Sequence, residues 1–246
     1  LWYPKDVQKY ADVRWHFEVP KGWKVASAMD KTADGAWHLS STLTPRMRAS
    51  ITQSGCIWLG PFSAKRTQLG DTELRVWTFD PWEDAATLAD KSTAMGQWFH
   101  TRLGFDLGRP FSIVFTPPGP EMATVWSGAG ASGTCYERPQ AGMKNWLLLG
   151  HRFAHPINEY APDGIYMARP EDQWFMEGWA SYIEVLALSG AGIQEEQLHF
   201  NGLYNVYNQK RDEHPHYAHT PLADDHAVSD PDQREYMHYL HGPLVV

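Results

Sequence analysis

Two histidines and one glutamate have the spacing of a metal site. His151 and His155 are four positions apart, so on a helix both imidazoles leave from one face, one turn apart. A helix can offer two ligands to a tetrahedral zinc ion in this way. Glu177 lies 22 residues after His155, in a second segment with helical patterning, where it can supply an oxygen as the third ligand. The three residues predict a zinc site with an open fourth position.

The histidine pair is a weak signal by itself. The chain has 12 histidines among 246 residues, so such pairs arise by chance. The alternative is that His151 and His155 are ordinary core histidines. The segment around Glu177 favours the metal site, because Glu177, Ser181 and Glu184 fall at i, i+4 and i+7 on one helical face. Ser181 and Glu184 are therefore candidates for hydrogen bonds that orient a ligand imidazole.

Two helices are expected to position these side chains, over residues 143–155 and 172–188. Pro156 follows directly after His155. A proline inside a helix clashes with the carbonyl four residues earlier and biases the preceding residue away from α geometry. We therefore expect the first helix to end at His155.

Three stretches resemble the gluzincin metallopeptidases, namely the aminopeptidase-N and glycyl-aminopeptidase families. Residues 150–160, GHRFAHPINEY, are similar to the family helix that carries His-Glu-x-x-His. Residues 174–184, WFMEGWASYIE, are similar to the helix that carries the glutamate ligand. Residues 236–246, YMHYLHGPLVV, resemble the segment with the family's catalytic tyrosine. The resemblance implies that His151, His155 and Glu177 bind zinc.

The same resemblance implies that Tyr239 stabilises an oxyanion, with His241 in place of the family's lysine. One departure affects the chemistry. The family's general base is a glutamate, and Arg152 stands at its position. Arginine stays protonated in proteins and has no acceptor, so it cannot take a proton from water. A cation beside a zinc ion also weakens zinc binding.

Three interpretations of Arg152 stay open. The first is a gluzincin fold with impaired or lost hydrolysis that keeps a peptide-binding cleft, or acts as a binding or scaffold module. The second is an active zinc aminopeptidase whose base is Glu159 or Glu184, either of which would have to reach the attacking water. The third is an engineered or unusual variant of an active enzyme.

A glycine-rich stretch over residues 127–133 precedes Glu137. In the resembling families this region holds an edge strand that grips the substrate backbone and its free amine. The resemblance therefore gives four candidates for substrate binding: Gly128, Gly130, Gly133 and Glu137. The glycine run itself contains no glutamate, and a plain surface turn is the alternative.

The patterning predicts a mixed α+β fold with two domains. Over residues 1–80, short stretches of alternating apolar residues predict an antiparallel β-domain. Over residues 81–246, helices and strands alternate, and the resemblance implies a thermolysin-like α/β domain, which we expect to be truncated at its C-terminus as a piece of a longer protein. Residues 199–235 are polar and histidine-rich, which favours a solvated loop over a second metal site.

Composition limits the partners. The net charge of −8 argues against nucleic acid, so a peptide or protein is the expected ligand. No apolar run reaches the roughly 18 residues that span a bilayer, which indicates a soluble chain. The compartment is not indicated, and export or membership of a larger membrane-associated protein both stay open. Cys56 and Cys135 can form a disulfide, although buried free thiols are favoured. The oligomeric state is not indicated.

Overall fold

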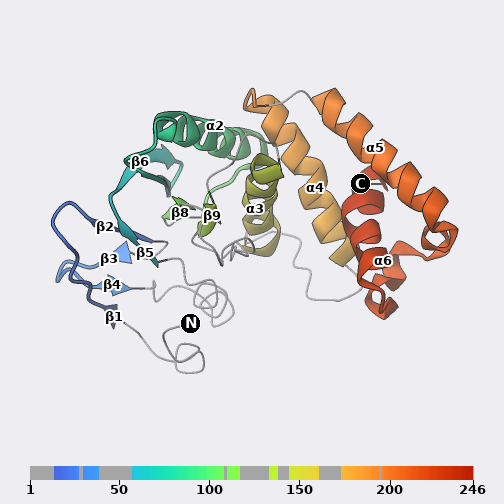
Figure 1. The fold of residues 1–246 in the computed structure, drawn as a ribbon, viewed down its shortest axis with the longest axis horizontal. Coiled ribbons are helices and arrows are strands. Elements are labelled where there is room, and N and C mark those ends of the chain that lie inside the picture. The colour runs from blue at the N-terminus through green and yellow to red at the C-terminus, as the bar shows by residue number, and fades with distance from the viewer. Residues whose placement is uncertain are drawn as a thin grey trace. The chain divides into compact units, whose positions relative to one another are not determined.

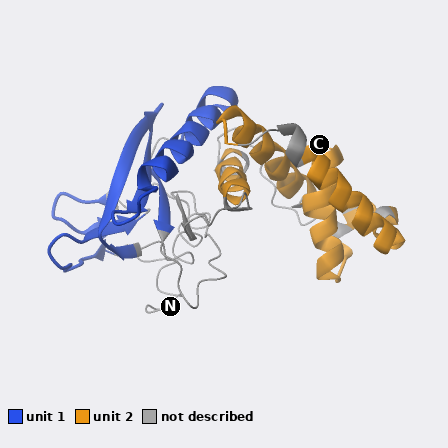
Figure 2. Ribbon diagram, turned by 45° about the horizontal axis from the view of Figure 1, so that its top comes forward, with its two compact units in different colours: residues 1–142 blue, residues 143–246 orange. Residues whose placement is uncertain are grey.

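The computed structural model describes residues 14–27, 30–38, 57–107, 110–116, 133–137, 144–160, 173–193 and 196–245. The chain is a mixed α+β protein, as the sequence predicts. It divides into two compact units, Leu1–Gly142 and Met143–Val246 (Figures 1 and 2). Among the helices in these ranges, none is both long and apolar enough to cross a membrane.

The first unit begins with two small antiparallel sheets. Strands β1 (Arg14–Trp15), β4 (Trp37–His38) and β3 (Asp30–Lys31) pair in that order. Strand β2 (Lys24–Ser27) pairs with β5 (Ile57–Gly60). The antiparallel pairing predicted for this part of the chain is present within these strands.

A four-stranded sheet follows, in the order β6 (Phe62–Leu69), β7 (Thr72–Phe79), β8 (Phe111–Thr116) and β9 (Gly133–Glu137). Strands β6 and β7 form an antiparallel hairpin, whereas β7, β8 and β9 run parallel to one another. Parallel neighbours need a crossover connection. Helix α2 (Ala85–Leu103) provides the one between β7 and β8, and it packs against β7 and β6 (Figure 1).

The core of this unit is apolar side chains from the sheet and from α2. The helix buries Leu88, Met95 and Phe99, while Val76 and Ile113 are buried on adjacent strands. Burying such a side chain contributes about 1.5–3 kcal/mol. A second cluster joins β2 to the larger sheet through Ala26, Phe62, Trp77 and Val114. The helix ends at Gly104, whose φ of 69° is readily adopted by glycine.

Strands on both sides of Asp80 and Pro81 belong to the same sheet. The change from strand to helix near residue 80 is therefore a change of element inside one compact unit, and the compact units divide after Gly142. Alternating patterning over residues 62–79 cannot reveal which later strands those residues pair with. The division into two domains, residues 1–80 and 81–246, stays a prediction. A division of the chain into compact units does not by itself define domains.

The second unit is helical (Figure 2). Helix α3 (Lys144–Tyr160) packs against α4 (Gln173–Gly190), and α5 (Glu196–Glu213) also contacts α4. Short segments follow: η3 (Pro215–His219), η4 (Leu222–Ala227), α6 (Pro231–Glu235), the π-helical η5 (Tyr236–His241) and α7 (Gly242–Val245). Segments η5 and α7 pack against α4, so α4 lies between α3 and the C-terminal segments.

Two predictions in this unit are wrong. Helix α3 continues through Pro156 to Tyr160 and does not end at His155. A proline costs about 3 kcal/mol inside a helix, and the buried face of α3, which includes Phe153 and Ala154, offsets it.

Residues 199–213 are helical and not a loop. Phe200, Leu203 and Tyr207 supply a half-buried stripe there, spaced for a helix but diluted by polar residues.

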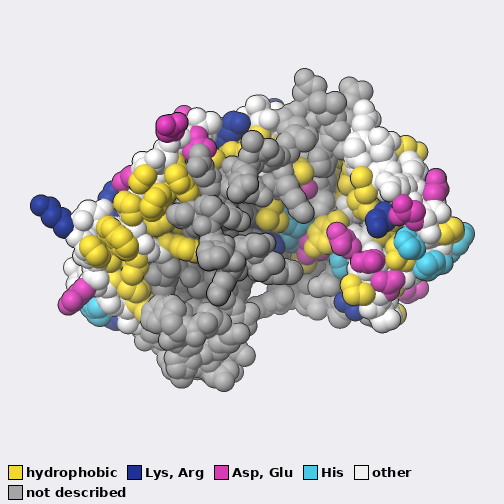
Figure 3. Space-filling model, in the orientation of Figure 1, with side chains coloured by type: hydrophobic (Ala, Val, Ile, Leu, Met, Phe, Trp, Pro, Cys, Tyr) yellow, Lys and Arg dark blue, Asp and Glu magenta, His cyan; other side chains and the backbone are white. Residues whose placement is uncertain are grey.

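The two units also differ at their surfaces. On the face drawn in Figure 3, hydrophobic side chains gather over the strands of the first unit, where Trp23 and Leu59 are exposed. Acidic side chains and histidines gather over α5 and α6 of the second unit. This face of α5 and α6 therefore carries many polar side chains. Tyr204 and Val206 on α5 are also exposed.

Candidate metal centre

Helix α3 presents both histidines on one buried face. His151 is 5% exposed and His155 is 3% exposed, and their ring centroids lie 4.6 Å apart. The four-residue spacing on a continuous helix places the two rings next to each other on successive turns. The extension of α3 beyond Pro156 therefore keeps His155 within regular helix, on the same face as His151.

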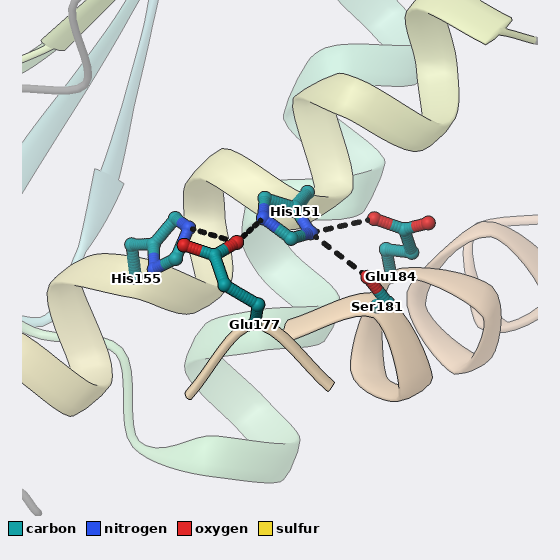
Figure 4. A network of polar contacts seen from close by, with 5 residues as sticks. All are labelled: His151, His155, Glu177, Ser181 and Glu184. Carbon is teal, nitrogen blue, oxygen red and sulfur yellow. Dashed lines mark hydrogen bonds and ion pairs between the residues drawn. The ribbon is translucent and has the colours of Figure 1, made fainter. Parts of the chain in front are cut away.

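Helix α4 places Glu177 between the two imidazoles (Figure 4). Its Oε2 atom lies 2.9 Å from Nε2 of His151 and 3.6 Å from Nε2 of His155. Ligand atoms of these three residues all lie within 4.8 Å of one another. Among the residues that the structure describes, this is the group of histidine, cysteine and acidic side chains that could hold a metal ion.

The other nitrogen of His151 is also held. Its Nδ1 lies 3.0 Å from Oε2 of Glu184 and 3.4 Å from Oγ of Ser181 (Figure 4). When Nδ1–H donates to Glu184, Nε2 carries the lone pair that faces Glu177, which is the tautomer a metal ligand needs. The neighbour of His151, Gly150, allows this contact, because a Cβ there would lie 3.0 Å from Cβ of Glu184.

The charges of this network depend on one another. Burial lowers the pKa of His151, but hydrogen bonds with Glu177 and Glu184 outweigh burial and raise it to about 9. Burial also disfavours the charged form of Glu177, yet its contacts with His151 and His155 hold its pKa well below the usual range. Burial raises the pKa of Glu184. The carboxylates thus favour positive charge at His151, and a bound cation would benefit from the same field.

Tyr239 reaches this site from the π-helical segment η5. Its ring centroid is 5.9 Å from that of His151, and the side chain remains 40% exposed. Burial raises the pKa of its hydroxyl, as do the charge of Glu177 and a hydrogen bond with Glu177. The structure therefore brings His151, His155, Glu177 and Tyr239 together, although Tyr239 and His151 are separated by 88 positions in the sequence.

Comparison with known proteins relates this fold to peptidases. No family model and no curated protein matches the sequence. Among solved structures, an aminopeptidase N family protein from Idiomarina loihiensis matches with a TM-score of 0.60 and 13% identity, over 91% of this chain and 42% of that one. An M1 zinc metallopeptidase from Deinococcus radiodurans, bound to Tyr-Ser-Ala, matches with a TM-score of 0.44 and 17% identity, over 77% and 43%.

The first of these likenesses shows a shared fold. The chain spans less than half the length of either solved structure.

The donor set fits a zinc ion. Ligand distances of about 2.0–2.2 Å in a tetrahedral site place neighbouring donor atoms roughly 3.3 Å apart. The two distances from Oε2 of Glu177 to the imidazole Nε2 atoms, 2.9 and 3.6 Å, lie on either side of that value. Two imidazoles and one carboxylate are also a donor set of catalytic zinc sites, which keep a fourth position open.

Arg152 lies next to His151 on α3 and is half-buried. Its charge lowers the pKa of Glu184 and of Tyr239, although burial has the larger effect on both groups and raises their pKa values. Contact of its guanidinium with Glu177 or a neighbouring acid stays a prediction.

The predicted substrate-binding residues lie in the other compact unit. Gly133 and Glu137 are the ends of β9, where their backbones pair with Ser112 and Thr116 of β8. Gly128 and Gly130 lie outside the described residues, as does Cys56, so the disulfide with Cys135 stays a prediction. Among the strands that the structure describes, β9 is the last in the order of the four-stranded sheet. Substrate binding by these residues stays a prediction.

The sequence analysis did not identify the glycines that allow α4 and the C-terminal segments to pack closely. Gly178 follows Glu177 on α4, and a Cβ there would lie 2.8 Å from the carbonyl carbon of Gly242. This approach places η5, and with it Tyr239, beside α4. The sequence signal is a glycine within an otherwise regular helical pattern. Close packing is one explanation for a glycine there, because glycine destabilises a helix relative to alanine.

Proposed function

We propose that this chain is a zinc-binding, gluzincin-type peptidase fold that binds peptides but hydrolyses them poorly. In this proposal His151, His155 and Glu177 hold the zinc ion. The same motifs also lead us to propose a thermolysin-like domain over residues 81–246. The convergence of the two Nε2 atoms on Oε2 of Glu177 carries the proposal, since it joins two helices into one donor set with zinc-like spacing.

Each remaining residue has a role that its chemistry allows. Zinc, when bound, supplies Lewis acidity that polarises a carbonyl group. Glu184 and Ser181 orient His151 through Nδ1. The Tyr239 hydroxyl can donate to an oxygen that gains negative charge, because it lies on the partly exposed side of the site.

Arg152 explains the poor hydrolysis. General-base assistance contributes about 10²–10⁴ in rate. A guanidinium stays protonated and cannot accept a proton, so this contribution is missing at the position where the resembling enzymes have glutamate. A fixed cation next to the donor set also weakens zinc binding, which lowers activity further.

A substitute base is the second candidate, and the geometry argues against Glu184. Its Oε2 contacts Nδ1 of His151, whereas the donor atoms converge at Nε2 on the other side of the ring. A carboxylate in that place would orient the imidazole and would not reach a water at the open coordination position. Glu159 lies on α3, and its side chain is outside the described part of the chain.

Metal analysis and peptide hydrolysis, measured on the same preparations, test the proposal. We expect about one zinc ion per chain and very slow release of aminoacyl groups by the unaltered protein. Arg152→Glu should raise turnover by about 10²–10⁴ if a general base is what is missing. Fast zinc-dependent turnover by the unaltered chain, lost in Glu159→Gln or lost in Glu184→Gln while that variant is fully loaded with zinc, would establish the substitute base. Failure to retain zinc under any loading condition would reject the proposed site.

A further inference from the structure

Tyr239 lies on a helical segment with π-helical winding. In η5 the hydrogen bonds join residues five apart, as where Gly242 N–H donates to Met237 O. Side chains five positions apart therefore lie near one another, whereas an α-helix would point them about 140° apart. The π-helix is rare, so contacts outside the segment must favour it here.

Three rings meet where α5 packs against η5, which lies beside it in Figure 1. Tyr207 of α5 stacks on Tyr236, with ring centroids 5.4 Å apart and planes inclined by 17°. The ring of His241 lies 5.5 Å from that of Tyr207 and 5.9 Å from that of Tyr236. Tyr236 and His241 are five positions apart, so the π-helical winding is what turns both of them toward Tyr207.

Ring packing holds His241 in this group. Its Nδ1 atom is buried, and no hydrogen bond to it is present in the described part of the chain. The three centroid distances fall within the range of roughly 4.5–7 Å at which aromatic rings attract one another. Tyr236 is 1% exposed, so the three rings are anchored inside the unit and not on its surface.

The same winding sets the direction of Tyr239. This residue lies between Tyr236 and His241 in the segment, and its ring centroid is 5.9 Å from that of His151. Because Tyr236 is buried, it cannot turn outward to accommodate a different winding. A change of η5 to α-helical winding would therefore redirect the Tyr239 side chain away from His151.

We propose that Tyr207 and His241 are positioning residues for Tyr239, because they hold η5 in the winding that directs this tyrosine to the metal donors. Tyr207 lies outside the three stretches that resemble gluzincins, so the resemblance does not imply this role. The catalytic meaning of the placement rests on the function proposed above. The placement itself does not depend on zinc.

Nuclear magnetic resonance tests the placement directly. The metal-free chain is deuterated except for the rings of tyrosine and histidine, and Tyr239→Phe identifies the Tyr239 signals. We expect a nuclear Overhauser effect between the rings of Tyr239 and His151, since their centroids are 5.9 Å apart. It should be lost in Tyr207→Ala and in His241→Ala. Tyr207→Phe and His241→Phe should retain it, because each keeps a flat ring.

The control variant is Tyr204→Ala. Tyr204 lies one turn earlier on α5, stacks on Tyr207 at 6.4 Å and is 55% exposed. This variant loses the same atoms as Tyr207→Ala but should retain the effect between Tyr239 and His151. Thermal unfolding verifies that each variant folds. If Tyr207→Ala does not fold, Tyr207→Leu replaces it, since leucine keeps apolar bulk without a flat ring, and the effect should again be lost.

Kinetics connect the placement to the chemistry. In zinc-loaded Arg152→Glu, the further change Tyr207→Ala should lower kcat by about 10²–10³ with little change in KM, as the loss of an oxyanion donor does. It should have no further effect once Tyr239 is phenylalanine, because a positioning residue acts through the residue that it places. His241→Phe should keep most of the activity, whereas a role of His241 in proton transfer would be lost with its imidazole.

The outcomes separate this inference from the proposed function. The positioning role is overturned if the Tyr239–His151 effect is absent from the unaltered chain, survives in folded Tyr207→Ala, or is lost equally in Tyr204→Ala. A loss of kcat in Tyr207→Ala that adds fully to that of Tyr239→Phe also overturns it. An inactive Arg152→Glu chain counts against the proposed function alone, since the resonance experiment still decides the placement.

Discussion

Gly178 on α4 and Gly242 at the start of α7 pack backbone against backbone. A Cβ on Gly178 would lie 2.8 Å from the carbonyl carbon of Gly242, and one on Gly242 would lie 2.9 Å from the carbonyl oxygen of Trp174. Gly178 adjoins Glu177, and Gly242 is three positions after Tyr239. The close approach of these two glycines therefore fixes how far the tyrosine lies from the metal donors.

Alanine at Gly178 should disturb this relationship. The methyl group would meet backbone atoms that cannot move aside alone, so we expect the free energy of unfolding to fall by about 1–3 kcal/mol. Displacement of η5 should also reduce any activity or peptide binding that depends on Tyr239. Denaturant unfolding followed by circular dichroism measures the stability change.

Gly202 provides the matched control for this substitution. It lies on helix α5, and an added Cβ there would meet no atom within 4 Å. Gly202→Ala should increase stability by up to about 1 kcal/mol, because alanine is the better helix former. Equal effects of the two substitutions would contradict the role of close packing at Gly178.

Zinc should stabilise the folded chain through its buried histidines. A ligand that binds only the folded state raises the unfolding temperature as its concentration exceeds its Kd. We expect zinc to raise this temperature and chelation to reverse the effect, with both responses absent in His155→Ala. The control is His216→Ala, since His216 is exposed on η3 in the same unit. A zinc response that survives in His155→Ala would reject the donor set.

Glu184 should act on zinc through His151. Glu184→Gln keeps a group that can accept from Nδ1 of His151 but removes the negative charge, so zinc affinity should fall by about 10–100-fold. Competition with a chromogenic chelator measures this affinity, and Glu213→Gln, an exposed substitution at the end of α5, is the control. Unchanged affinity in Glu184→Gln would show that the contact with His151 is only structural.

The donor residues could be predicted because their relation is local. His151 and His155 share a face through helical periodicity alone, and Glu177, Ser181 and Glu184 do the same on the second helix. Which atoms meet across α3 and α4 depends on interhelical packing, and the sequence does not reveal it. The approach of Glu184 to His151 needs Gly150, a close contact that only the packed structure reveals.

Other parts of the fold could not be predicted because tertiary packing overrides local preference. Pro156 opposes a helix locally, yet α3 continues past it. The polar stretch around Tyr207 is helical because one stripe packs against the rest of the unit, where Tyr207 stacks on Tyr236 with centroids 5.4 Å apart. The π-helix that carries Tyr239 also has no local sequence signal.

Asp230 should make the segment before Tyr239 sensitive to acid. Its carboxylate caps α6 by accepting from Asp232 N–H at 3.0 Å, and it also accepts from the Tyr217 hydroxyl at 3.1 Å. Burial alone would raise the pKa of Asp230. The hydrogen bonds from Asp232 and Tyr217, together with the charge of His214, outweigh burial and lower it.

A carboxyl whose pKa is lower in the folded state stabilises that state above its unfolded pKa of about 3.9, and this stabilisation is lost as pH falls through the folded value. The unfolding temperature of the metal-free chain should therefore drop below about pH 4, and it should drop less steeply in Asp230→Asn, because asparagine keeps a capping oxygen but does not titrate. Asp224→Asn, at an exposed position of η4, is the control. Scanning calorimetry from neutral pH to well below the unfolded pKa of about 3.9 measures the slopes. Parallel curves for the unaltered chain and Asp230→Asn would show that this carboxylate does not link the C-terminal segments to pH.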